Sequence, residues 1–494
     1  MPNPYLDFPG DYNLNKIEII TASGEVLPLR MGMIIELNIY EDIESSALTG
    51  AMSMIDSSNI ITNAPLQGNE RLLFKLSTPV SEYDERVAID ATEETGFPFH
   101  IYAVTNRVIQ SETLSSYTIH FCSRELLRNA RTKISRAYEG ELHQAAIKIL
   151  RDKNGLDSVK RLHFEPTKNV DKLVIPNMRP FEALDLVADR ALSKNSEAAG
   201  YYFYETTKGF HFRSYESMLA TQGKYARPPK LTLAYQPKAL PVGNRNAYNM
   251  HNVDSYEFIQ HFDTLSQQSM GTYSSRVITY SIYDKSYNIA DFNYHDRFTR
   301  HLHADQLSDS SSRNYHIGDS PVDFDSRLGG NVPGRIGDKT VSDYHESKVI
   351  LQPSSRFVHG AETSSFTKDE GMSEAVKESQ INQVNNSTRL KIVMPGHSYI
   401  EAGDVVEFQL PSLERNKGEY STSQFDEKYS GRYLVAKLRH RLIKQEYRLV
   451  LELIKDSVAK PYIKGSNTYK GKPPVERGTI DIYQEDKNIN YFAS

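Results

Sequence analysis

The chain has 494 residues, which is enough for two to four domains and a sizeable hydrophobic core. Its hydrophobic fraction of 39% and charged fraction of 24% are ordinary for a globular protein and exclude a disordered or fibrous chain. The formal net charge of −5 excludes the basic excess with which a nucleic-acid-binding surface neutralises phosphates.

Cys122 is the only cysteine, so the chain can form no internal disulfide and no cysteine-based zinc site. A chain without disulfides fits folding in a reducing cytosol. The first residues, Met1 to Tyr5, contain neither the basic nor the apolar region of a signal peptide. No apolar run approaches the roughly 18 residues of a membrane-spanning helix, and we expect no membrane anchoring.

The first quarter of the chain is predicted to be β-structure. Alternating apolar and polar residues over 17–20, 32–40 and 49–56, separated by turn residues, are typical of strands with one buried face. Further alternating runs follow near residues 101–104 and 117–121. We therefore expect a β-domain that ends at Cys122.

The pattern changes at Ser123, which is an expected N-cap for a helix. A second helix is predicted after Gly140, and a third begins at Pro180 with apolar residues at a spacing of 3.6 residues. Two short strands, 201–205 and 209–213, form the next predicted hairpin. These elements predict an α+β module.

The second half returns to strands over 250–290. A stretch poor in apolar residues follows over 291–360, and we expect it to be an insertion that is loosely ordered near 304–340. A polar helix is predicted over roughly 373–383. The residues after Lys460 have no periodicity and contain Pro461, Pro473 and Pro474, which suggests a docking tail.

One pattern occurs twice, first around Gly68 and again around Gly403. Each glycine precedes a strand that ends Phe-x-Leu, and a polar stretch then leads to two alternating runs. We interpret the two copies as two similar small antiparallel β-barrels. The architectural residues that this repeat predicts are two glycines at barrel turns and four aromatic barrel side chains: Gly68, Phe74, Tyr102, Gly403, Phe408 and Tyr433.

The predicted fold class is therefore α+β and predominantly β. The expected domains are a first tube-like β-barrel (1–122), an α+β module (123–236), the start of a second β-barrel (237–290), an insertion that ends in a helix (291–379), the rest of the second barrel (380–457) and a C-terminal docking tail (458–494).

Several clusters could indicate chemistry, and each has a structural interpretation that we favour. A group of acids and histidines lacks the helical spacing of a metal site, and we expect a structural role or a solvated loop: Asp291, His295, Asp296, His301 and His303. The glycine-rich stretch 329–337 lacks the Lys-Ser/Thr of a phosphate-binding loop. Residues 439–441 read Arg-His-Arg, either an exposed strand face or a contact with a neighbouring subunit or DNA. We expect no catalytic, cofactor-binding or metal-binding residues.

Motifs spread over residues 15–455 resemble those of a known family. They are the turn at 65–70, the strand-to-helix junction at 121–125, the Pro-Phe helix start at 180–184, the hairpin of 202–206 and 209–214, and the strand of 390–396 that leads to 403–406. In these motifs the chain resembles the baseplate hub proteins of contractile-tailed bacteriophages and, more distantly, the hub part of the VgrG spikes of type VI secretion.

The resemblance implies a structural virion protein rather than an enzyme. It implies a homotrimer in the tail baseplate, assembled in the host bacterial cytoplasm, whose six barrels surround a channel for DNA in transit. Its implied partners are a central spike protein, a tail tube or tube-initiator protein and the surrounding baseplate wedge proteins. Two alternatives stay open: the hub of a secretion or injection device, and a tail-associated cell-wall hydrolase.

Overall fold

The structure is a computed structural model. It describes residues 10–58, 60–63, 66–78, 88–94, 97–112, 114–168, 170–220, 229–235, 251–261, 263–283, 285–297, 300–304, 315–316, 345–354, 370–411, 425–426, 428–443 and 446–458. The loosely ordered stretch predicted near 304–340, the glycine-rich stretch at 329–337 and the docking tail lie almost entirely outside these residues.

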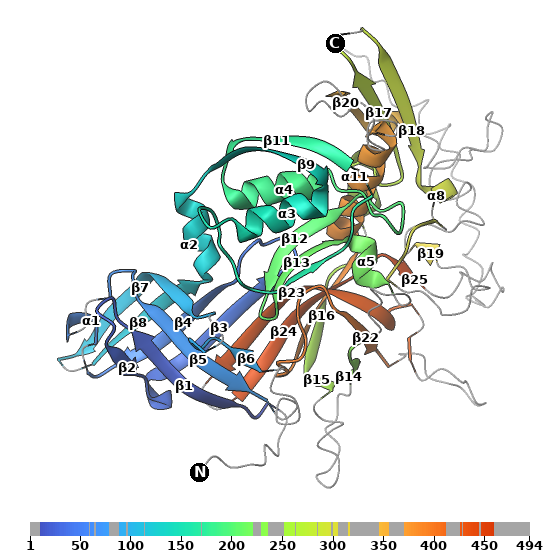
Figure 1. Ribbon diagram of the computed structural model, residues 1–494. Coiled ribbons are helices and arrows are strands. Elements are labelled where there is room, and N and C mark those ends of the chain that lie inside the picture. Colours follow the sequence, from blue (N-terminus) through green and yellow to red (C-terminus); the bar gives the residue numbers. More distant parts are fainter. Residues whose placement is uncertain are drawn as a thin grey trace, which may run out of the picture. The chain divides into compact units, whose positions relative to one another are not determined.

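Fifteen strands form the largest sheet, which is antiparallel in most of its pairings. The sheet has two regions along the chain. Region one is the N-terminal part, with β1 (Asn13–Ile20), β2 (Val26–Pro28), β3 (Ile34–Asp42), β4 (Thr49–Asp56), β5 (Arg71–Ser77), β6 (Ile89–Asp90), β7 (Phe99–Ser111) and β8 (Leu114–Cys122). Region two contributes β14 (Thr232–Tyr235), β15 (Asn252–Val253), β16 (Ser255–Gln260), β21 (Thr388–Pro395), β22 (Val405–Gln409), β23 (Gly431–Ile443) and β24 (Glu446–Lys455). Figure 1 shows region one in blue and β22 to β24 in orange to red.

The α+β module between the two regions has the predicted helices and hairpin. Its elements are α2 (Arg124–Arg131), β9 (Ile134–Glu141), α3 (Leu142–Arg151), β10 (Leu162–Phe164), β11 (Val170–Met178), α4 (Pro180–Asp189), β12 (Tyr201–Thr206), β13 (Gly209–Ser214) and α5 (Tyr215–Leu219). Ser123 is the N-cap of α2, and Pro180 starts α4, where a missing N–H costs nothing. The apolar faces of α3 and α4 form the module's own core with β9, β11 and the β12–β13 hairpin.

Residues 264–386, which include the predicted insertion and are called the insertion from here on, contain a small sheet and a helix. Its elements are α7 (Thr264–Ser269), β17 (Ser274–Tyr280), β18 (Tyr287–Asn293), α8 (Tyr294–Arg297), the 3₁₀ turn η7 (His345–Ser347), β20 (Val349–Pro353) and α11 (Glu370–Asn386), which includes the helix predicted at 373–383. Strand β17 pairs with β18 and β20 and with no strand of region two, so the boundary drawn at residue 290 falls within this sheet. The remaining four described elements are short: the 3₁₀ turn η1 (Met31–Met33), α1 (Ile60–Asn63), and the paired strands β19 (Tyr315–His316) and β25 (Ser457–Val458).

Regions one and two share one strand order. Region one runs β2-β1-β5-β7-β8-β4-β3, and region two runs β15-β14-β22-β23-β24-β21-β16. In sequence the seven strands occur in the same order in both regions, so β3 corresponds to β16, β5 to β22 and β7 to β23. The corresponding strands β1 and β14 differ in direction: β1 pairs antiparallel with β5, whereas β14 pairs parallel with β22.

The two predicted closed barrels are not found among the described residues. In each region the hydrogen-bonded series starts at one strand and ends at another, and no ladder between described strands closes it into a ring. The edge of β3 that could close region one pairs instead with β23 of region two. This pairing explains why the buried side chains of both regions form one continuous core. Within the described residues, no helix has the length and apolar content that crossing a membrane requires.

Candidate assembly site

A buried carboxylate organises the turn before the equivalent strands β5 and β22. The carboxylate of Glu70 accepts the backbone N–H groups of Gln67, Gly68 and Asn69 at 2.8 to 3.1 Å. Asp404 stands at the corresponding place and accepts the N–H of Glu401 at 2.9 Å. Gly68 and Gly403 both have positive φ, +95° and +85°, which side chains disfavour. Both predicted glycines therefore lie at turns that enter corresponding strands.

Phe74 and Phe408 occupy corresponding core positions. Phe74 is fully buried and stacks on Phe99, with ring centroids 5.6 Å apart. Phe408 is fully buried and meets Tyr433 edge-on, with centroids 6.2 Å apart. Aromatic pairs of this kind add about 0.5–1.5 kcal/mol beyond their buried area. Phe74 and Phe408 therefore both lie in the shared core.

Tyr102 does not correspond to Tyr433. A β-bulge lies between Ile101 and Ala103 on β7, and an equivalent bulge lies between Val435 and Lys437 on β23. When the two bulges are aligned, Phe99 corresponds to Tyr433. Tyr102, which is 47% exposed, lies at the bulge itself. Tyr102 therefore does not occupy the core position of Tyr433, because a bulge shifts which residues face the core without changing the sequence pattern.

The two regions are joined by a strand-to-strand seam between β3 and β23. Residues 36–42 pair antiparallel with residues 437–443. Glu36 accepts hydrogen bonds from Arg439 at 2.8 Å and from Arg441 at 2.9 Å, and Lys437 lies 3.0 Å from Asp42. The pKa of Glu36 is lowered: burial raises it, but the hydrogen bond and charge of Arg441, together with Arg439, outweigh that effect. The Arg-His-Arg stretch thus belongs to an intramolecular joint.

Glu41 links the seam to the α+β module and to the turn before β22. Its buried carboxylate accepts the N–H of Thr207 and of Ala402, both at 2.8 Å, and lies 3.6 Å from the buried imidazole of His440. His440 in turn contacts the hydroxyl of Tyr447 at 2.6 Å. Burial raises the pKa of Glu41, but the His440 imidazole and the Ala402 N–H lower it overall. One side chain therefore connects three parts of the chain.

A second buried cluster fixes the module to region one. Lys160 Nζ lies 2.9 Å from the carboxylate of Glu125 and 2.5 Å from that of Glu205, whose other oxygen accepts the N–H of Leu48 in region one. Burial lowers the pKa of Lys160, but the two carboxylates raise it overall, so the ammonium stays charged. Removing one partner of such a group leaves a buried charge uncompensated, which typically costs about 3–5 kcal/mol.

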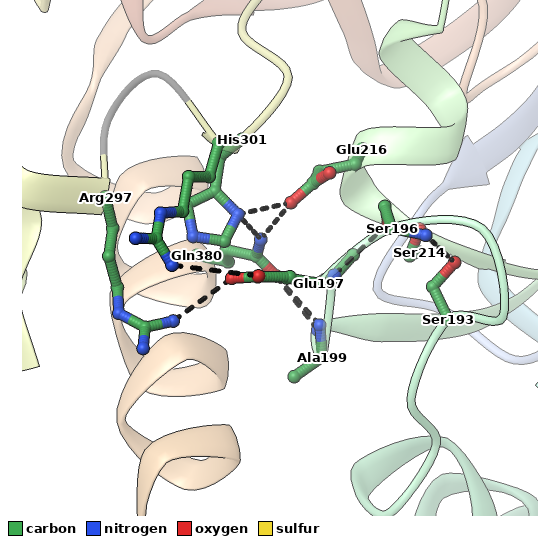
Figure 2. Close-up of polar contacts among 12 residues, drawn as sticks. Ser193, Ser196, Glu197, Ala199, Ser214, Glu216, Arg297, His301 and Gln380 are labelled. Atoms are coloured by element: carbon green, nitrogen blue, oxygen red, sulfur yellow. Dashed lines mark hydrogen bonds and ion pairs between the residues drawn. The ribbon is translucent and has the colours of Figure 1, made fainter. Parts of the chain in front are cut away.

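A third cluster fixes the insertion to the module, as Figure 2 shows. His301 Nδ1 lies 2.6 Å from Glu216 on α5, and the amide of Gln380 on α11 donates to the same carboxylate at 2.7 Å. The Gln380 carbonyl accepts the N–H of Ala199 and of Gly200 at 3.2 and 3.0 Å. An adjoining cavity of about 10 Å³ is at the lower limit for a single water molecule.

The predicted acid-and-histidine cluster does not form a metal site in the described part of the chain. Asp291 is paired with Arg276 at 2.6 Å, His301 with Glu216, and His303 with Asp456 at 2.9 Å. No group of three or more possible metal ligands occurs among the described residues. Within this part of the chain, the histidines therefore join segments that are distant in sequence.

Cys122 is fully buried at the end of β8. Burial, together with the nearby carboxylate of Glu205, raises the pKa of its thiol to about 12. A thiol with so high a pKa is protonated at neutral pH and unreactive. Cys122 is thus a small core side chain.

No protein-family model matches the chain, and no curated protein matches its sequence. Among solved structures, it is similar to a tail protein from Neisseria meningitidis MC58 (10% identity, 91% of this chain and 98% of that chain, TM-score 0.47). It is also similar to the 43 kDa tail protein of prophage MuSo2 from Shewanella oneidensis (10% identity, 90% and 98%, TM-score 0.46). The E. coli c3393 protein, a component of the type VI secretion system, matches with 9% identity, 92% and 79% coverage and a TM-score of 0.37. Tail proteins and a secretion component are thus among the structures that the chain is similar to.

Proposed function

We propose that this protein is the central hub of a phage tail baseplate, a structural virion protein whose chains assemble into a ring. The observation that carries the proposal is the β3–β23 seam, considered together with the shared strand order of the two regions. A seam that joins region one to region two within a chain has a counterpart that can join region two to region one of the next chain.

The counterpart strands have edges available for that joint. Strand β16, which corresponds to β3, pairs with β21 alone among the described strands. Strand β7, which corresponds to β23, pairs with β5 only at Phe99 and His100, so the rest of that edge has no partner strand in the described part of the chain. Open edges promote uncontrolled association, and a closed ring of chains removes them.

The ring contains three chains and six β-regions, in line with the resemblance to hub proteins. Each region is close to a barrel: in region two a single residue, Asp254, separates β15 at one end of the series from β16 at the other. A ring with threefold chains and six similar regions can contact both a threefold spike and a sixfold tail tube. The channel of the ring passes DNA in transit. Each chain has a formal net charge of −5, which disfavours retention of nucleic acid.

The remaining assignments follow from that role. The partners are the spike, the tube or its initiator and the baseplate wedge proteins, and the protein resides in the virion tail after assembly in the host cytoplasm. Its work is mechanical, so neither catalysis nor a cofactor is required. The six architectural positions support the regions from within, and residues 458–494 are offered as the tail that contacts a neighbouring component.

The seam gives the register of the proposed joint between chains. Asn38 lies opposite Arg441, and the corresponding residues are Glu257 on β16 and Val108 on β7. The variant Glu257→Cys/Val108→Cys is expected to form a disulfide between chains on mild oxidation, because directly opposed residues have Cβ atoms about 4.5–5.5 Å apart. Cys122 does not interfere, since it is buried.

The matched control is Glu257→Cys/Ile109→Cys, which is one residue out of register and places the second thiol on the other face of the strand. Light scattering should give a trimer mass of 3 × 56.2 = 168.6 kDa, alone or with the spike. Equal cross-linking of both variants, or a monomer under both conditions, would contradict the ring.

A further inference from the structure

The sheet of the insertion has one covered face and one open face. Strand β17 is central, with β18 antiparallel on one side and β20 parallel on the other. Helix α11 packs on one face, where Val277 and Phe292 are buried against Ala375 and Val376. Several apolar side chains on the other face are exposed among the described residues, and Figure 1 labels the three strands and α11.

The open face is apolar. The register places Ile278, Ile289 and Leu351 in one row across the three strands, and Tyr280, Tyr287 and Pro353 in the next. Tyr287 is 72% exposed, Leu351 67%, Val349 50% and Ile289 47%. Ile282 and Tyr283, at the turn after β17, are similarly exposed. We call these six exposed side chains, Ile282, Tyr283, Tyr287, Ile289, Val349 and Leu351, the insertion face.

The charges beside the insertion face compensate one another. Arg276 and Asp291 are opposite each other in the third row and form two hydrogen bonds, at 2.6 and 2.9 Å. This pair therefore adds no net charge to the row, and two copies of the row do not repel each other. The chemistry of the insertion face fits an uncharged, apolar protein surface.

The area of the insertion face is close to what one side of a stable protein interface needs. Two largely exposed tyrosines and four aliphatic side chains offer roughly 700 Å² of apolar surface, and one side of a standard interface buries about 800 Å². Exposed apolar patches of this size usually mark an interaction site.

We infer that a second copy of this chain covers the insertion face, as an additional contact between neighbours in the proposed ring on which this inference rests. In the proposed joint, the edge of β16 in one chain pairs with the edge of β7 in the next. Its length is comparable to the pairing of residues 36–42 with 437–443. A single strand pairing buries too little surface for a stable oligomer. The insertion face supplies apolar area that such a joint lacks, and its neutrality lets the same chain serve as partner.

The first test is the mass of the variant Ile289→Asp/Leu351→Asp, compared with Val159→Asp/Val174→Asp, which changes two exposed valines of the module. Two buried carboxylates in the contact should shift the insertion variant from 168.6 kDa towards 56.2 kDa at concentrations where the control stays trimeric. A trimeric wild type with an equally stable trimeric insertion variant would overturn this inference and leave the ring intact. A monomeric wild type would overturn the ring itself, and this inference with it.

The second test does not depend on a destabilising charge. In the trimer, a maleimide should label the thiol of Leu351→Cys at least tenfold more slowly than that of Val159→Cys, since Leu351 is covered only by the second copy. Equal labelling rates in a verified trimer would show that the face is open to solvent or reserved for another partner, and would overturn the inference.

Discussion

Regions one and two share a strand order but differ in what covers the outer edge of their longest strand. On β23 this edge pairs with β3, and Glu36 and Asp42 on β3 face Lys437, Arg439 and Arg441 on β23. On β7 and β16 the positions corresponding to Glu36, Arg439 and Arg441 carry no charge: they are Ser255, Thr105 and Val108.

This difference teaches how two similar joints in one ring can avoid exchanging partners. If β3 of one chain paired with β7 of another, Glu36 would lose both arginines and gain no cation at those positions. If β16 paired with β23, the arginines would lose Glu36 but would face Glu257, which corresponds to Asn38. The charges therefore disfavour the exchange of β3 onto β7, and specificity is a difference of this kind.

The largest expected effect comes from removing the corresponding core aromatics. Phe74→Ala and Phe408→Ala should each lower the free energy of unfolding by about 3–5 kcal/mol, because both side chains are fully buried. Chemical denaturation measures the loss, with Phe425→Ala, at a 38% exposed position, as the control. A single shifted transition in both variants would indicate one cooperative core, and separate transitions would indicate that the regions unfold independently.

The next largest effect is expected at Glu41, which connects region one to the α+β module and to the turn before β22. Glu41→Gln should cost about 3 kcal/mol at pH 7, since two buried N–H groups lose a charged acceptor. Because the pKa of Glu41 is lowered in the folded protein, its contribution is present above its unfolded pKa of about 4.3 and lost as pH falls through the folded value. The stability gap to wild type should therefore narrow below about pH 4. Glu44→Gln, at an exposed position, should cost little at any pH; a gap that widened in acid would contradict the assignment.

The two turn glycines should respond unequally to alanine. Both have positive φ, which costs about 1–2 kcal/mol for a side chain. A Cβ on Gly403 would lie 2.1 Å from the hydroxyl oxygen of Tyr204, whereas a Cβ on Gly68 would have no neighbour closer than 3.8 Å. Gly403→Ala should therefore cost about 2 kcal/mol or more, and Gly68→Ala about 1.

Thermal unfolding measures this difference. Tyr204→Phe removes the clashing oxygen and should recover part of the loss in the Gly403→Ala background but not in the Gly68→Ala background. Equal losses for the two glycine variants would show that the packing around Gly403 is looser than described.

The smallest effect on stability is expected at the seam charges. Arg441→Ala removes a partly exposed ion pair with Glu36 and should cost no more than about 1 kcal/mol, less at high salt. The effect on pairing specificity should be larger, and mixed oligomers detected by native mass spectrometry would reveal exchanged joints. Arg448→Ala, whose partner Glu446 is two residues away on the same strand, is the control without a role in the seam.

Local structure was readable from the sequence alone. The N-cap Ser123, the Pro180 helix start, the hairpin of β12 and β13 and helix α11 each lie where their residue pattern predicted. Gly68 and Gly403 have positive φ at turns, and Phe74 and Phe408 are buried. These features depend on neighbours within a few positions, so the sequence contains the required information.

The partners of the strands were decided by tertiary structure. The pairing of β3 with β23 joins residues about 400 positions apart, the bulge beside Tyr102 shifts the core position to Phe99, and β17 pairs within the insertion rather than with region two. Alternation along a strand reports which face is buried and says nothing of which strand lies beside it. The sequence therefore determined the elements and their buried faces, whereas the joining of two regions and the edges left open depend on packing between distant segments.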